Sequence, residues 1–178
     1  FLPGRPARSA DRLLAPPIND HLPEGVATLA NRLKPLGYRS ICIGKWHLGT
    51  AGQGPTDRGF DAAIPGNANP GAESPQGGKG EIGQAQSAID FITAHQQSHA
   101  SEPFLLYVGF DSPHIPLAAP QRLIESNSTA FNPLYAAVVE GLDTAVGQIL
   151  AALDRHGLAD TTLVVFTSDN GGLHVPEG

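Results

Sequence analysis

The chain has 178 residues, a hydrophobic fraction of 40% and a formal net charge of -6 at pH 7. This composition is typical of one globular domain and excludes disordered and fibrous classes. The acidic balance, with a sequence pI near 5.5, argues against a nucleic-acid binder, which would need a clustered basic face. No apolar stretch approaches the ~20 residues that cross a bilayer, so we expect no membrane span. The single cysteine excludes an intrachain disulfide.

The first half of the chain contains one predicted helix and one predicted strand. Apolar residues fall at helical spacing over residues 24–36, and Gly37 follows where a helix often stops. Residues 39–44 form a short apolar run with two isoleucines, which is typical of a buried strand. Residues 49–80 are rich in Gly, Pro, Asn and Ser, and we expect them to form a long loop.

The second half alternates predicted helices with apolar strands. Helical spacing returns over residues 82–92, and residues 104–110, FLLYVGF, follow as a predicted strand. The longest helical pattern covers residues 132–156 and ends at Gly157, before a further apolar run at residues 162–166. Apolar runs that alternate with helices indicate parallel strands covered on both faces. The predicted fold class is therefore α/β, with a mostly parallel sheet between helices.

Each of the three predicted strands is followed by a polar motif, namely GKWHLG, DSPHIP and SDNGG. In open parallel sheets ligands bind at the carboxyl ends of the strands, where the departing loops meet. We therefore expect one site to be built from the side chains of Lys45, His47, His114, Asp169 and Asn170.

These residue types suit the hydrolysis of an anionic ester. Asp169 and Asn170 offer hard oxygen ligands for Ca²⁺ or Mg²⁺. Lys45 supplies a positive charge for an anionic substrate, and His47 and His114 offer proton transfer near neutral pH. A metal, a lysine and histidines together favour a phosphate or sulfate ester as substrate, because charge on its oxygens must be neutralised.

Several segments together resemble the type I sulfatases, the arylsulfatase-like branch of the alkaline phosphatase superfamily. They are GKWHLG after a helix ending in LGYR, HIPL at residues 114–117, and YAAVVEGLDTAVGQILAALDRHGLADTTLVVFTSDNGG, and they occur in the family's order over residues 2–178. The resemblance implies an alkaline phosphatase-like fold that is incomplete at both ends. It also implies a single partial sulfatase catalytic domain over residues 1–178.

The resemblance assigns roles to the five candidate residues. Lys45 and His47 match family residues that lie against the nucleophile and the sulfate, and His114 matches one that contacts the sulfate and assists the leaving group. Lys45 and His114 are thus implied to bind substrate. Asp169 and Asn170 match ligands of a divalent cation, usually Ca²⁺, with Mg²⁺ as the alternative. The implied substrate is a sulfated small molecule or glycan, and the implied location is periplasmic, secreted or lysosomal.

The chain departs from the family pattern at the nucleophile. That nucleophile is a formylglycine made from Cys or Ser in a C/S-x-P-x-R motif, which is absent from the sequence, and Cys42 lies inside a predicted strand. Because FLPGRPARS resembles the segment just downstream of the motif, we expect the nucleophile and the earlier acidic metal ligands before residue 1. A later family lysine has no counterpart before Gly178. We expect the isolated fragment to be inactive and to self-associate through an unpaired sheet edge.

Two other functions stay open. A phosphomonoester, phosphodiester or phosphonate hydrolase of the same superfamily would also combine metal, lysine and histidine. A non-catalytic relative that binds sulfated ligands would lack the nucleophile. At the level of single residues, His114 could be structural in its proline-rich turn, and Asp169 with Asn170 could form only an Asx turn.

Other signals receive structural interpretations. Trp46 is expected to pack, and Cys42 to be a small buried core residue. His95 and His99 have the spacing of a helical metal pair, but the segment is expected to be a solvated helix end. Residues 77–81, GGKGE, resemble a phosphate loop but have no Ser or Thr after the lysine and no preceding strand, so they are discounted.

Overall fold

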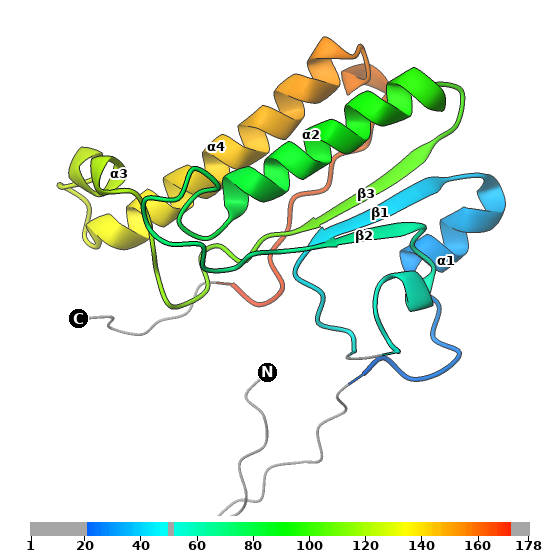
Figure 1. Ribbon diagram of the computed structural model, residues 1–178, viewed down its shortest axis with the longest axis horizontal. Helices are drawn as coiled ribbons and strands as arrows, with labels where there is room; N and C mark the ends of the chain where they lie inside the picture. Colours follow the sequence, from blue (N-terminus) through cyan, green and yellow to red (C-terminus); the bar gives the residue numbers. More distant parts are fainter. Residues whose placement is uncertain (1–20, 50–51, 172–178) are drawn as a thin grey trace, which may run out of the picture.

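The computed structural model describes residues 21–49 and 52–171, which form a three-stranded parallel sheet with helices on both faces (Figure 1). The strands are β1 (Arg39–Gly44), β2 (Ala62–Pro65) and β3 (Phe104–Gly109), in the order β2-β1-β3. The central strand β1 is almost entirely buried, as its apolar sequence predicts. The α/β class and the parallel arrangement are thus confirmed.

Two long helices cover one face of the sheet (Figure 1). They are α2 (Glu81–Ser98) and α4 (Pro133–Arg155), and they agree closely with the predicted helices. Ile41 and Ile43 of β1 pack against Ala88 of α2, because alternate residues of a strand face the same side. Helix α4 packs on α2 through Ile92 and Ala152. A short helix, α3 (Gln121–Ser126), lies against the first turns of α4.

The opposite face of β1 is covered by α1 (Leu29–Leu33). Cys42 is 1% exposed there and clusters with Ala30 and Phe60. The indole of Trp46 meets Phe60 edge to face, with ring centroids 6.1 Å apart at 87°. The predicted packing roles of Trp46 and Cys42 are therefore confirmed.

Helix α1 is shorter than the predicted helix over residues 24–36. It begins after Thr28, whose side chain accepts a hydrogen bond from the Asn31 amide in a capping box. It gives way to the 3-10 helix Lys34–Leu36, which contains Pro35. Proline has no N–H to continue the α-helical ladder, which explains the early end.

The predicted loop over residues 49–80 contains two elements that were not predicted. A 3-10 helix covers Thr56–Arg58, and β2 pairs with β1 in the register Ile41 to Ala62 and Gly44 to Pro65. All four residues of β2 are exposed, so the strand has no buried apolar pattern to reveal it.

The prediction of a strand at residues 162–166 is wrong. After the 3-10 helix Ala159–Thr161, this run has no strand pairing within the described residues. Its apolar side chains are exposed to solvent, with Leu163 89% and Phe166 73% exposed. A strand needs a neighbouring strand to pair with as well as β-forming residues, and the sequence pattern indicates only the β-forming residues.

Two further expectations need correction. The sequence was expected to contain no stretch apolar enough to cross a membrane, but α4 is long and apolar enough by length and mean hydropathy alone. Its contacts with α2 and α3 make it a core helix in this fold. His95 is buried rather than solvated. Its Nε2 lies 2.8 Å from the Glu102 carbonyl oxygen, and its ring packs against those of Phe91 and Phe104.

Candidate active site at the carboxyl edge of the sheet

The ends of β1 and β3 are joined by a backbone hydrogen bond. Gly44 and Gly109 are opposite each other in the ladder, and the Lys45 amide donates to the Gly109 carbonyl oxygen at 2.7 Å. Gly44 has a φ of +89, and a Cβ there would lie 2.3 Å from that carbonyl. Glycine is therefore required for this close approach. The motifs GKWHLG and DSPHIP consequently leave the sheet at the same edge, as predicted.

The GKWHLG segment is held by its tryptophan. The Trp46 indole nitrogen donates to the Gln53 carbonyl oxygen at 2.9 Å, and the Leu22 amide donates to the Leu48 carbonyl oxygen at 2.8 Å. Lys45 is half-buried and His47 is exposed on either side of this anchor. The local fold therefore presents a cation and an imidazole at the edge of the sheet.

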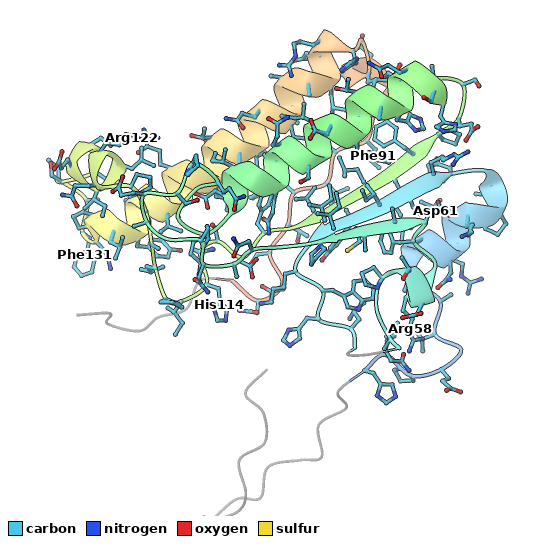
Figure 2. All side chains as sticks on the ribbon, in the orientation of Figure 1. Arg58, Asp61, Phe91, His114, Arg122 and Phe131 are labelled. Carbon is cyan, nitrogen blue, oxygen red and sulfur yellow. The ribbon has the colours of Figure 1, made fainter. Side chains whose placement is uncertain are left out.

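His114 lies in a tight turn directly after β3. Its amide donates to the Asp111 carbonyl oxygen at 2.7 Å, and Nδ1 lies 2.6 Å from the Ile115 carbonyl oxygen. Because a carbonyl oxygen only accepts, Nδ1 must carry the proton, which leaves Nε2 free of it in the neutral ring. The side chain is exposed (Figure 2). In this view His114 and Asp61 lie at opposite ends of the sheet (Figure 2).

Asp111 is a polar residue at the same edge that is not among the predicted site residues. Its Oδ2 accepts a hydrogen bond of 3.3 Å from Nε2 of Gln84, a buried residue in the first turn of α2. Gln84 also lines a cavity of about 180 Å³, with Ile43 of β1 and Ile64 of β2. The position of Asp111 directly after the strand was the available signal.

Asp169 and Asn170 are both exposed. The Gly171 amide donates to Ser168 Oγ at 2.9 Å, so the SDNG segment forms a local turn. Burial raises the pKa of the Tyr107 hydroxyl, and the charges of Cys42 and Asp169 add to this effect. Tyr107 pairs with Cys42 across β1 and β3, so its side chain lies on the face of the sheet that α1 covers.

The described residues include the two side chains that the sequence predicts as metal ligands. Asp169 and Asn170 supply two adjacent oxygen donors, the ligand type that Ca²⁺ and Mg²⁺ prefer. Within residues 21–49 and 52–171 no three side chains of His, Cys, Asp or Glu gather around a point that could hold a metal. Ca²⁺ takes six to eight oxygens, so these two would be a minority of its ligands.

Sequence comparison connects the chain with known sulfatases. The family model described as Sulfatase matches residues 1–177. Arylsulfatase J of Mus musculus is 30% identical over 181 residues, covering 85% of this chain and 30% of the mouse protein. The N-acetylgalactosamine-6-sulfatase of Mus musculus is 32% identical, covering 84% of this chain and 34% of its own length. The chain thus spans about a third of the length of these curated relatives.

Solved structures show the same fold. The crystal structure of Ps i-CgsB matches with a TM-score of 0.66 at 21% identity, over 80% of this chain and 39% of that one. A structure described under the metabolism of multiple glycosaminoglycans by Bacteroides thetaiotaomicron matches with a TM-score of 0.62 at 21% identity, over 81% of this chain and 45% of that one. Both have the alkaline phosphatase-like fold. With the family match over nearly the whole chain, the protein belongs to the sulfatase family.

Proposed function

We propose that the chain forms the central part of the catalytic domain of a sulfuric ester hydrolase. The observation that carries the proposal is the hydrogen bond from the Lys45 amide to the Gly109 carbonyl. This bond brings the lysine and histidine motif of β1 to the same edge as the histidine turn of β3. Both motifs stand in a chain of the sulfatase family.

Each residue at this edge has a chemical role in the proposal. The Lys45 ammonium attracts the sulfate and neutralises charge on its oxygens. His47, on the same segment, faces the nucleophile and the sulfate. In the protonated ring of His114, Nε2 holds the proton that the departing alkoxide takes, while the bond from Nδ1 to the Ile115 carbonyl fixes the ring.

A divalent cation, Ca²⁺ or in second place Mg²⁺, would be held in part by Asp169 and Asn170. When bound, it would neutralise charge on the sulfate and on the nucleophile. The nucleophile of the proposal is a formylglycine in a C/S-x-P-x-R motif upstream of residue 1. The two oxygen donors fit a hard cation, and they need further ligands from other segments to complete its shell.

We propose a sulfated glycan or a sulfated small molecule as the substrate class. Supporting this, a similar solved structure is described as Ps i-CgsB in complex with k-i-k-neocarrahexaose, with a TM-score of 0.60 at 22% identity over 72% of this chain. The name N-acetylgalactosamine-6-sulfatase also points to a sulfated sugar for that relative. Export to the periplasm, the lysosome or the medium is part of the same proposal.

The test compares aryl sulfate with aryl phosphate as substrates of the full-length protein that carries this chain. We expect faster hydrolysis of the sulfate ester, loss of rate with a chelator, and recovery with added Ca²⁺. Peptide mass spectrometry of the same preparation should find a formylglycine. A clear preference for phosphate would favour a phosphoester hydrolase, and sulfated-ligand binding without turnover or formylglycine would favour a non-catalytic relative.

A further inference from the structure

The segment Gly77–Glu81, named the GGKGE segment, carries a lysine in the protein interior. Lys79 is 1% exposed, and it is the largest fully buried side chain among the described residues. Burying an ammonium group is expensive unless it is paired and hydrogen-bonded, so its partners must supply compensation. A lysine in such a place therefore points to a specific structural or functional task.

Among the described residues, the Lys79 ammonium group donates hydrogen bonds to oxygens of two other segments. Nζ donates to the carbonyl oxygen of Pro116 at 2.9 Å and to Oδ1 of Asn69 at 2.7 Å. Hydrogen bonds from a charged donor are shorter and stronger than neutral ones. Pro116 comes two residues after His114, so the lysine holds the segment that carries the candidate catalytic histidine.

The glycines beside Lys79 pack against two other segments of the chain, and Gly78 packs against the one that follows His114. A Cβ on Gly78 would lie 2.1 Å from the Ala118 carbonyl oxygen, and one on Gly80 would lie 2.2 Å from the Asn67 carbonyl oxygen. Gly80 also has a φ of +79, which disfavours other residues. The backbone of the GGKGE segment thus fits directly against the chain that follows His114.

Glu81 fixes the other side of the GGKGE segment. It is 3% exposed, and its Oε2 accepts a hydrogen bond of 2.8 Å from the Lys79 amide. Its Oε1 lies so close to α4 that a Cβ on Gly141 would come within 2.6 Å. The buried Glu81 side chain therefore holds the backbone at Lys79 and ties the segment to the long helix.

From these contacts we propose that Lys79 is a positioning residue that holds the His114 turn at the carboxyl edge of the sheet. The inference rests on the proposed function of His114 in assisting the leaving group. The GGKGE segment is accordingly no phosphate loop, because its lysine binds protein oxygens in the interior. Lys79 acts through Pro116 and the peptide chain, and it does not touch the substrate.

A positioning role through His114 predicts a dependence on the leaving group. Phenoxide is a poor leaving group that needs a proton, whereas para-nitrophenoxide leaves readily without one. Displacement of His114 should therefore slow phenyl sulfate hydrolysis more than para-nitrophenyl sulfate hydrolysis. General acid assistance contributes roughly 100-fold or more, so a difference of about tenfold between the two substrates is expected from partial displacement.

The experiment uses the full-length protein with Lys79→Met, which keeps the length of the side chain and removes the ammonium group. Lys34→Met is the matched control, because Lys34 is an exposed lysine paired with Asp61, which lies at the opposite end of the sheet from His114 (Figure 2). We expect kcat to fall for Lys79→Met, with the larger loss on phenyl sulfate, and to stay unchanged for Lys34→Met. In a His114→Ala background, Lys79→Met should cause little further loss.

Asn69→Ala is the second variant and serves where Lys79→Met fails to fold. Asn69 is exposed, and the change removes one acceptor from the ammonium group, so the same substrate preference should appear more weakly. Hydrogen exchange gives a readout that does not depend on turnover. Peptides covering residues 114–119 should exchange faster in both variants than in the wild type.

Equal losses on the two sulfate esters, or losses that add to those of His114→Ala, would overturn the positioning role. Unchanged exchange over residues 114–119 in Lys79→Met would overturn the anchor itself. If the wild type hydrolyses neither ester, the proposed function fails, and the exchange measurement alone decides whether Lys79 holds the turn. The two failures are thereby distinguished.

Discussion

The backbone amide of Lys45 donates a 2.7 Å hydrogen bond to the carbonyl oxygen of Gly109, at the point where β1 and β3 end together. The bond joins two motifs that are more than sixty residues apart in the sequence. It places the lysine of one beside the strand that leads to the histidine of the other. The proposed site depends on this contact, and several consequences can be measured.

Gly109→Ala should weaken the sheet at this contact. A Cβ on Gly109 would lie 2.5 Å from the Lys45 carbonyl oxygen, so the ends of the two strands would have to separate. We expect the free energy of unfolding to fall by about 1–3 kcal/mol, the usual effect of overpacking. Urea denaturation of the full-length protein measures this change.

Gly147→Ala is the matched control for that substitution. Gly147 lies within α4, and nothing lies within 4 Å of a Cβ placed there. Alanine in a helix interior is favoured over glycine by about 1 kcal/mol, so this variant should be unchanged or more stable. If Gly109→Ala behaved in the same way, the close approach of the strands would be wrong.

Asp61→Asn should destabilise the start of the sheet at neutral pH and not at low pH. The hydrogen bond from Lys34 is the main cause that lowers the pKa of Asp61, and hydrogen bonds from the Ser40 amide and hydroxyl lower it further. A lowered native pKa gives stability that is present above the unfolded value of 3.8 and is lost as the pH falls through the native value.

We expect Asp61→Asn to cost about 1 kcal/mol at pH 7, since the carboxylate is partly exposed and its ion pair is weakened by solvent. The unfolding free energies of mutant and wild type should converge below pH 3.8. Asp160→Asn, at an exposed position in the 3-10 helix Ala159–Thr161, serves as the control without an effect. A constant difference at every pH would exclude an ionised Asp61 as the cause.

Cys42 should be inert in the folded protein. Burial raises the pKa of its thiol from 9.0 to about 11, and the thiolate is the reactive form. At pH 8 the thiolate fraction is roughly a hundredfold lower in the folded than in the unfolded chain, a direct consequence of that difference. A thiol reagent should therefore react slowly with native protein and quickly after denaturation.

The same shift has a consequence for stability at high pH. A raised native pKa gives stability that is complete below pH 9.0 and is lost as the pH rises toward about 11. Tyr107, whose pKa burial also raises, acts in the same direction. Unfolding free energies should fall over this range, and less steeply in Cys42→Ala. Rapid reaction of Cys42 with a thiol reagent in the native protein at pH 8 would contradict its buried position.

The isolated 178-residue chain should self-associate through its exposed apolar run. Leu163, Val165 and Phe166 are all exposed within this short run, and exposed apolar surface promotes association. Leu163→Ser with Phe166→Ser should reduce the apparent mass in sedimentation or light scattering. Val26→Ser, at a single exposed apolar position outside the run, should not reduce it. A monodisperse monomer before mutation would contradict this expectation.

The strongly periodic parts of the fold could be predicted from the sequence. Helices α2 and α4 have long apolar faces, and β1 and β3 are short apolar runs that become inner or partly buried strands. The strand β2 was not predicted, because all its residues are exposed and it has no buried apolar pattern. It forms by pairing with the edge of β1 that β3 leaves free. The strand prediction for residues 162–166 was wrong for the opposite reason. These residues have the composition of a strand, but no strand among the described residues pairs with them.

The site was predictable to the extent that it follows from strand ends. Lys45 and His114 lie at the same edge because β1 and β3 are parallel neighbours. The importance of Lys79 could not be predicted, because burial of a lysine depends on oxygens from distant segments. The GGKGE segment resembles a phosphate loop in sequence, and the packing of Gly78 against Ala118 reveals its different use.

The most direct test of the proposed site is sulfate release from an aryl sulfate by the full-length protein and by its Lys45→Ala variant. Lys34→Ala removes an exposed lysine paired with Asp61 at the opposite end of the sheet (Figure 2) and is the control. We predict that the wild type and Lys34→Ala release sulfate at equal rates and that Lys45→Ala loses at least about 100-fold, as for a lost group that stabilises transition-state charge. Full activity of Lys45→Ala would contradict the proposed site.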